Sequence, residues 1–318
     1  MENKEKKLAL LLLVGALGLS LISLMIGPAS SGNIFSPENR PILLHLRFPR
    51  VLGAWICGGA LALSGAIIQT VLNNPLSSAN ILGINSACGF FSVLAGIFFP
   101  TSFAAGSIFS FIGGMIASLF IVLMVRRKNP SRLTIILAGL AIGSLFSAGI
   151  DLLLVIDPDA LSGYASFKIG SLSALSLKRV LQSALILVPL MIAVLILSRQ
   201  LEMFSFGALH SGAMGFSFAR WMIVFLMVAS ALASQVVSLC GLIGFVGLIV
   251  PAWLRRFNFS MSGYLMLSLL AGAVLVLVSD LIGRVCFLPW EMPAGLILSL
   301  FGGPYFLVLL FTKGKNYA

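Results

Sequence analysis

The sequence predicts an all-α integral membrane protein with about ten transmembrane helices, in a single domain over residues 1–318. Three observations predict this fold class. Hydrophobic residues make up 59% and charged residues 9% of the chain, whereas a soluble domain carries about 25% charged residues. The mean hydropathy is +1.11. The apolar runs are long and continuous, without the alternation of a membrane β-strand, so we expect helices.

The first apolar run, residues 8–26, follows Lys4, Lys6 and Lys7 and has two interpretations. It has the form of a signal peptide, with residues 29–31 as a cleavage site. Because the run is longer than a usual signal core of about 7–15 residues, we expect a retained first span. The further spans are expected, to within a few residues, at 51–72, 81–99, 103–125, 133–156, 180–197, 221–240, 244–254 (short), 264–282 and 293–311.

The net charge of +11 would point to nucleic acid in a soluble chain, but here it indicates topology. Basic residues collect in the cytoplasmic loops of membrane proteins. If the N-terminus is cytoplasmic, thirteen of the 20 Lys and Arg residues fall on inner segments and seven on outer ones. We therefore expect a multi-pass protein of the bacterial plasma membrane with both termini in the cytoplasm. Its surroundings would be membrane lipid, and no nucleic acid partner is expected.

The longest inner loop, at about residues 200–220, combines Gly and Ser with several large apolar side chains. Such a mixture favours a short amphipathic helix that lies on the membrane surface or against a partner. A plain connecting loop is the alternative. The large apolar residues are Phe204, Phe206, Leu209, Met214 and Phe216.

Residues that could carry chemistry are scarce. Asp151 and Asp280 are the acidic residues placed within spans, and Asp280 lies four residues before Arg284, where a local ion pair is expected. An ion-coupled carrier usually keeps several ionisable groups near the bilayer midplane, so that alternative rests on Asp151. His45 and His210 form no metal-binding pair, and no phosphate-binding glycine loop is present. We expect neither catalysis nor a metal site, and any ATP hydrolysis would need another subunit.

Several ordered blocks carry a family resemblance. They are Arg47–Leu52, Gly59–Ala66 with Gln69, Asn73–Leu76, Leu82–Ile84, Gly241–Pro251 followed by Arg255, Asp280–Leu281, Glu291–Pro293 with Gly295, and Gly302–Pro304. Together these blocks resemble the iron-siderophore, haem and cobalamin family of ABC importer permeases (FecCD-type, BtuC-like), and the similarity covers essentially the whole chain.

The resemblance implies a permease that imports an iron chelate, either a siderophore or haem, by ATP-driven alternating access. Cobalamin or another corrinoid is the alternative cargo, and an oxyanion a lesser one. The implied partners are a second permease copy (identical or related), two cytoplasmic ATPase subunits that hold ATP and Mg, and an extracytoplasmic substrate-binding protein. This chain itself is expected to bind no cofactor. A membrane scaffold that transports nothing is a third class, and it would tolerate loss of residues 206–218.

The resemblance also assigns roles to three groups of residues. Arginines on the outer face would dock the binding protein, although they could equally anchor helix ends, and Glu291 could satisfy Arg284 internally. Asn74 and Pro75 would also suit a simple turn. Ala208, Leu209 and Ala252 depart from the family pattern, which often has acidic residues at the first two positions and His at the third. The assignments are docking at Arg47, Arg50 and Arg284; a cytoplasmic gate at Asn74, Pro75, Leu76, Ser131 and Arg132; and ATPase coupling at Phe206, Gly207, Ala208, Leu209, Met214, Gly215 and Phe216.

Overall fold

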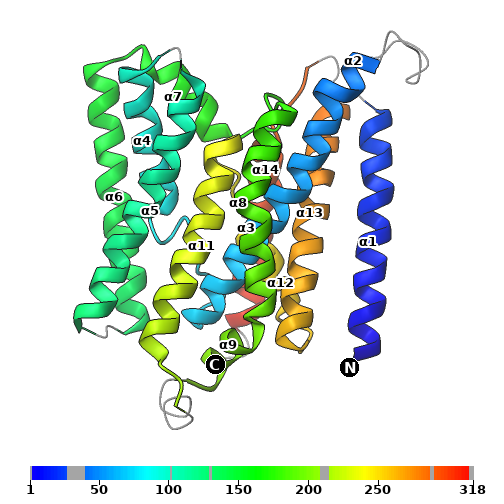
Figure 1. The fold of residues 1–318 in the computed structure, drawn as a ribbon, viewed down its shortest axis with the longest axis vertical. Helices are drawn as coiled ribbons and strands as arrows, with labels where there is room; N and C mark the ends of the chain where they lie inside the picture. Colours follow the sequence, from blue (N-terminus) through cyan, green and yellow to red (C-terminus); the bar gives the residue numbers. More distant parts are fainter. Residues whose placement is uncertain are drawn as a thin grey trace.

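The computed structural model describes residues 2–26, 40–100, 102–128, 131–207, 215–286 and 290–314, and every regular element among them is helical. The helices form one bundle with their long axes side by side (Figure 1). We call the face where α1 begins the N-terminal face, and the other end of the bundle the opposite face.

Seven helices in the described part of the chain are long and apolar enough to cross a membrane. One of them is continuous from residue 40 to residue 71, through the short α2, a π-helical stretch η2 and α3. The sequence predicted a span in each of these seven places, and the structure confirms them with ends that differ by a few residues. They are α1 (Glu2–Met25), α2 (Arg40–Ile42) with η2 (Leu43–Arg47) and α3 (Phe48–Val71), α5 (Phe103–Lys128), α6 (Arg132–Ile156), α8 (Leu177–Ile196), α11 (Phe218–Cys240) and α13 (Met261–Val285).

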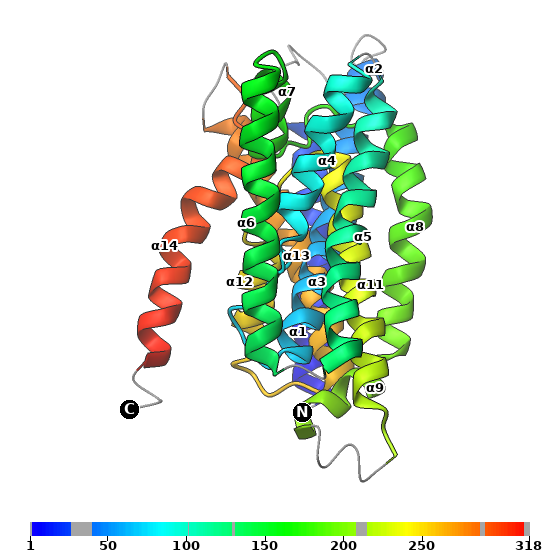
Figure 2. The same ribbon diagram turned by 90° about the vertical axis from the view of Figure 1, so that its left-hand side faces the viewer.

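The remaining three predicted spans are helices as well: α4 (Ile84–Phe98), α12 (Val246–Leu254) and α14 (Ala294–Gly314). At 1.5 Å per residue, the nine residues of α12 reach only about half of a bilayer core of roughly 30 Å. Figure 2 shows α14 leaning away from the rest of the bundle. Three further helices cap the bundle ends: α7 (Ala160–Ile169), α9 (Ser198–Glu202) and the 3-10 helix η3 (Met203–Phe206). The sequence did not predict α7, whereas α9 and η3 lie at the start of the inner loop, at about 200–220, where a short amphipathic helix was predicted.

Helix α3 forms the centre of the bundle, and nearly all its residues are buried. It packs against α13, α11, α12 and α8. Small residues bring the backbones together: a Cβ atom at Gly58 would overlap the backbone of Gly272 in α13, and one at Gly65 would overlap Gly247 in α12. Lipid provides no hydrophobic driving force between helices, so such close packing is what holds membrane helices together.

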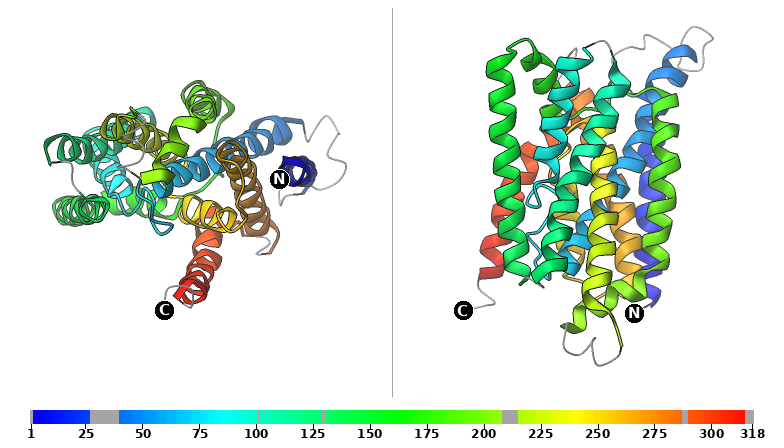
Figure 3. Two further views of the ribbon diagram at one scale, coloured as in Figure 1. Left: turned by 90° about the horizontal axis from the view of Figure 1, so that it is seen from below. Right: turned by 60° about the vertical axis from the view of Figure 1, so that its left-hand side comes forward.

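Helix α1 stands at the rim of the bundle beside α13 (Figures 1 and 3). At the N-terminal face, Ser260 donates from its backbone N–H and its hydroxyl to the Glu5 carboxylate at 2.7 and 2.8 Å. Further along, the Trp55 indole donates to Ser20 Oγ at 2.9 Å. These contacts attach α1 to α3 and to the start of α13. A retained first span stays a prediction.

Candidate functional site

Residues 72–83, between α3 and α4, turn back into the bundle from the N-terminal face (Figure 1). Asn73 has a positive φ of 47°, a conformation that Asn tolerates better than most residues. The Asn74 side chain accepts a hydrogen bond from the Leu76 N–H at 2.9 Å, and the Asn74 N–H donates to the Gln69 carbonyl at 3.1 Å. Asn74 therefore closes a tight turn around Pro75. Its role as a gate stays a prediction.

The re-entrant segment ends against α6. Gly83 has a φ of +73° and precedes the first residue of α4. A Cβ atom there would lie 2.7 Å from the Gly139 carbonyl oxygen and 2.7 Å from the Gly143 nitrogen, both in α6. Only glycine combines this backbone conformation with so close an approach. Residues 81–83, which follow the predicted gate turn, thus pack directly on α6, the helix that begins at Arg132.

Ser131 and Arg132 have different tasks at the start of α6. Ser131 caps the helix, because its hydroxyl accepts from the Thr134 N–H at 3.2 Å. Arg132 donates to the Phe204 carbonyl at 3.4 Å, and its guanidinium lies 5.8 Å from the centre of the Phe218 ring, within cation–π range. Within the described residues, Arg132 makes its polar contact with Phe204 rather than with the turn at Asn74.

Phe204 is the centre of an aromatic clamp formed by Phe204, Phe216, Phe218, Trp221 and Phe225. It is fully buried, and its ring centre lies 5.6, 4.6 and 5.8 Å from those of Phe216, Phe218 and Phe225. The Phe216 and Trp221 rings stack at 6.1 Å. These residues flank the predicted coupling segment, 206–216, on both sides. The clamp therefore joins the two ends of that segment and attaches them to α6 through Arg132.

The coupling segment is described only at its ends. Phe206 is exposed, and Gly207 and Gly215 both have positive φ, 79° and 77°. Only glycine adopts this backbone readily, so the chain turns sharply where it leaves η3 and where it returns. Ala208, Leu209 and Met214 lie outside the described residues, as does most of the predicted amphipathic helix.

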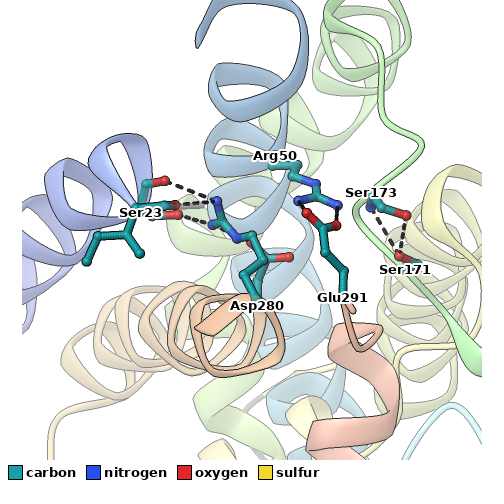
Figure 4. A network of polar contacts seen from close by, with 8 residues as sticks. Ser23, Arg50, Ser171, Ser173, Asp280 and Glu291 are labelled. Atoms are coloured by element: carbon teal, nitrogen blue, oxygen red, sulfur yellow. Dashed lines mark hydrogen bonds and ion pairs between the residues drawn. The ribbon is translucent and has the colours of Figure 1, made fainter. Parts of the chain in front are cut away.

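Three buried arginines gather at the opposite face, and all three bind within the chain. Figure 4 shows Arg50 directed at Glu291. Arg47 is 4% exposed and donates to the carbonyls of residues 24 and 25, at the end of α1, at 2.8 and 3.1 Å. Arg50 is 8% exposed and forms a bidentate pair with Glu291 at 2.5 and 3.3 Å. Arg284 is 2% exposed and pairs with Asp280 at 2.6 Å.

Arg284 additionally donates to the carbonyl and hydroxyl of Ser23 in α1. The predicted Asp280–Arg284 pair is therefore confirmed, whereas Glu291 pairs with Arg50 rather than with Arg284. These contacts anchor the ends of α1 and α13 and the turn before α14. Docking of a binding protein through the same arginines stays a prediction, because every contact described here lies within the chain.

The Arg50–Glu291 pair predicts a pH-dependent contribution to stability. The hydrogen bond from Arg50, followed by the charges of Arg50 and Arg284, lowers the pKa of Glu291, although partial burial opposes the shift. A lowered folded-state pKa stabilises the fold above the ordinary Glu pKa, and this contribution is lost as pH falls through the lowered value. Glu291→Gln should therefore melt below wild type at pH 7, and the difference should shrink towards pH 3. A difference that stays constant with pH would contradict this account.

A cavity of about 1080 Å³ opens at the opposite face between α4, α5, α7 and the end of α11. Arg179 lines it and donates to the Leu239 carbonyl at 3.1 Å. Asp157 and Asp159 line it as well, while Asp151 is exposed on α6. Serines are its commonest lining residues: Ser92, Ser102, Ser107, Ser110, Ser162, Ser166, Ser171, Ser173 and Ser238. Sequence reasoning missed this cavity, although Ser162 and Ser166, four residues apart, indicate a hydroxyl-bearing helix face.

A comparison with known families decides what this bundle is. The model of the FecCD transport family matches residues 10–312. The chain is a member of the FecCD transport family. The resemblance drawn from the ordered sequence blocks is thereby confirmed, and with it the classification of the chain as an ABC transporter permease.

Similar proteins cover this FecCD permease almost completely. An iron(III)-citrate import permease of Bacillus subtilis is 32% identical over 99% of this chain and 98% of its own length. An iron-uptake permease from the same organism is 36% identical over 97% of each chain. A haem-iron transport permease of Staphylococcus aureus is 32% identical over 99% and 98%. Each comparison extends over the whole bundle, α1 and α14 included.

A solved metal-chelate-type ABC transporter in an inward-facing conformation superimposes on the FecCD permease described here with a TM-score of 0.88. The two are 27% identical, and the match covers 96% of this chain and 99% of that one. The predicted fold class is therefore confirmed. The family identifies the chain as a transport subunit rather than an enzyme.

Proposed function

We propose that this FecCD permease imports an iron chelate, a siderophore or haem, by alternating access that ATP hydrolysis in two partner ATPase subunits drives. The relatives named as permeases for iron(III) citrate, haem iron and, in Escherichia coli, ferric enterobactin support this cargo class. A corrinoid is the alternative within the family. The chain would work with a second permease copy and an extracytoplasmic binding protein, and would bind no cofactor itself, because ATP and Mg would be held by the ATPases.

The observation that carries the proposal is the connection between Arg132 and the aromatic clamp. An ATPase that moves the coupling segment would pull on Phe204, which is packed too tightly to move independently of Phe218. Because Arg132 binds both, the pull would reach the start of α6. Helix α6 in turn packs against Gly83, which ends the segment that begins with the turn at Asn74. A displacement at the N-terminal face would thus shift the predicted gate as a rigid-body movement.

The proposed orientation of the protein in the membrane follows from the distribution of its charged residues. The excess of Lys and Arg on the N-terminal face would make that face cytoplasmic, and the opposite face would receive the binding protein. Docking through Arg47, Arg50 and Arg284 would require each to exchange its present partner. Arg50 is best placed to do so, because its partner Glu291 is partly exposed. The serine-lined cavity at that face would offer many weak hydrogen bonds to an oxygen-rich chelate without trapping it.

ATP hydrolysis by the reconstituted complex tests the proposal. The chain is co-purified with a candidate ATPase subunit, placed in nanodiscs and mixed with the candidate binding protein loaded with ferric siderophore, haem or corrinoid in turn. We expect one loaded form to stimulate hydrolysis. If no ATPase associates and uptake follows an ion gradient and fails in Asp151→Asn, the chain is an ion-coupled carrier. If deletion of residues 206–218 leaves its cellular role unchanged, the chain is a scaffold.

Loss of the Arg132 contacts should uncouple hydrolysis from transport. In Arg132→Met the side chain keeps an unbranched apolar stem but can neither donate to Phe204 nor make a cation–π contact with the Phe218 ring. We expect uptake per ATP hydrolysed to fall about tenfold, within the usual range for coupling between sites. The measurement is chelate uptake and ATP hydrolysis in the same proteoliposomes. Arg126→Met, at the exposed end of α5, is the matched control. An equal loss of uptake per ATP in both variants would contradict the connection through Arg132 between the aromatic clamp and α6.

A further inference from the structure

The N-terminal face carries a basic corner that the transport mechanism does not use. We define it as Lys4 and Lys7 of α1 with Trp253, Arg256 and Phe257, which end and follow α12. Two segments more than 240 residues apart in sequence meet here because Ser260 donates two hydrogen bonds to the Glu5 carboxylate. The same carboxylate lies against Gly263 at the start of α13. Glu5 thereby ties the start of α1, which carries the two lysines, to the loop that follows Arg256.

The charge of this corner is strongly positive. The residues from 1 to 26 and from 246 to 264 include Lys4, Lys6, Lys7, Arg255 and Arg256 against Glu2 and Glu5. Arg255 points inward, where it donates to Thr70 Oγ1 at 2.8 Å and contacts Tyr264. Lys4, Lys7 and Arg256 are exposed, and none of their three side chains makes a hydrogen bond or ion pair within the described residues. The corner therefore presents cationic donors that the chain itself leaves available.

Aromatic rings set the depth of this corner in the membrane. Trp253 is 36% exposed and Phe257 46% exposed, and their ring centres lie 5.3 Å apart in a T-shaped contact. Phe257 also stacks on Phe259 at 5.7 Å. Trp and Tyr are enriched at the ends of membrane helices, at the level of the lipid headgroups. The exposed Trp253 would therefore place Arg256, three residues further along, at phosphate height.

The apolar flank of the corner distinguishes a lipid from other anions. Immediately beyond Lys7, α1 exposes Leu10, Leu11 and Val14 at the rim of the bundle. A molecule that bears a phosphate and an acyl chain would match both the basic and the apolar surface. Its phosphate would lie on the basic side chains and its acyl chain along Leu10, Leu11 and Val14. A soluble phosphate would contact the basic side chains alone. We infer that the basic corner is a binding site for the headgroup of an anionic phospholipid, such as phosphatidylglycerol.

Basic residues next to a membrane helix attract anionic lipid with about 1 kcal/mol each, which corresponds to roughly fivefold in affinity per residue. Neutralising three of them should therefore weaken binding by about a hundredfold. The site lies away from the coupling segment and the serine-lined cavity. Lipid binding at this site can therefore be tested independently of the cargo and of the ATPase.

Native mass spectrometry of the full chain in detergent tests the site with three probes of known composition. Dioleoylphosphatidylglycerol is compared with dioleoylphosphatidylcholine, which has the same chains and no net charge, and with inorganic phosphate. The variant combines Lys4→Gln, Lys7→Gln and Arg256→Gln, and each substitution is also measured singly in case the triple variant does not fold. The matched control removes three exposed charges elsewhere on the same face: Arg126→Gln, Arg199→Gln and Arg220→Gln.

We expect phosphatidylglycerol to bind at least about tenfold more tightly than phosphatidylcholine, to bind weakly in the corner variant and to bind normally in the control. Any one of three results would overturn the inference. They are equal binding of the two lipids, equal loss in the control variant, and displacement of phosphatidylglycerol by inorganic phosphate at a similar concentration, which would show that the acyl chain contributes nothing.

Discussion

Gly65→Leu should yield little or no monodisperse protein, or protein whose melting temperature is lower by about 10 °C. Any side chain at Gly65 would overlap the carbonyl group of Gly247, and a backbone cannot rotate away as a side chain does. Overpacking of a core costs about 1–3 kcal/mol, and here α3 and α12 must also separate. Their separation would break the bonds from the Gln69 side chain to the carbonyls of Gly247 and Leu248, at 3.4 and 3.1 Å.

The matched control is Gly15→Leu in α1, where a Cβ atom would meet nothing within 4 Å. It introduces the same side chain into the middle of another span and should melt like wild type. Gly65→Ala should lie between the two, because even one methyl group overlaps Gly247. Fluorescence-detected size-exclusion chromatography and thermal melting of the three variants measure the difference. Equal melting of Gly65→Leu and Gly15→Leu would show that the α3–α12 crossing does not limit stability.

Arg284→Met should destabilise the bundle by about 3–5 kcal/mol, the usual cost of leaving one partner of a buried ion pair uncompensated. The substitution leaves the Asp280 carboxylate, 6% exposed, with no cation beside it. The carbonyl and hydroxyl of Ser23 also lose their donor. The measurement is the melting temperature of the chain alone in detergent, without binding protein or ATPase.

A double-mutant cycle separates the ion pair from the other contacts of Arg284. Asp280→Asn combined with Arg284→Met should be more stable than the sum of the two single effects, because the stranded charge is then gone. The experiment also distinguishes anchoring from docking. If Arg284→Met melts like wild type and loses only stimulation by the loaded binding protein, the arginine serves the partner rather than the fold.

The sequence predicted the long helices because each is an uninterrupted apolar run of sufficient length. It also indicated that α12 would be short, since Gly241 and Gly244 precede it and Arg255 follows it. Helix α7 was missed for a physical reason. Residues 157–176 hold Pro158, Gly163, Gly170 and many serines, a composition typical of turns, and neighbouring helices rather than propensity stabilise its ten residues.

The candidate site was predictable only where its contacts are local. Asp280 and Arg284 lie four residues apart on one helix, so their pairing could be inferred from spacing. Arg132 and Phe204 are 72 residues apart, and Arg50 and Glu291 are 241 apart, so nothing in the sequence connects them. Charged residues near helix ends were interpreted as surface residues, whereas the carbonyls at the end of α1 give Arg47 a buried partner. No sequence pattern marks such a carbonyl.

The double attachment of α1 has a consequence for how the chain is assembled during synthesis. Helix α1 is translated first, yet its partners at both ends lie in or beside α13: Ser260 for Glu5, and Arg284 for Ser23. Before residues 260–284 are made, the described contacts available to α1 are those with α3 and η2, where Trp55 and Arg47 reach it. Helix α1 is thus synthesised before the partners that fix both its ends, and those contacts can form only when α13 is in place.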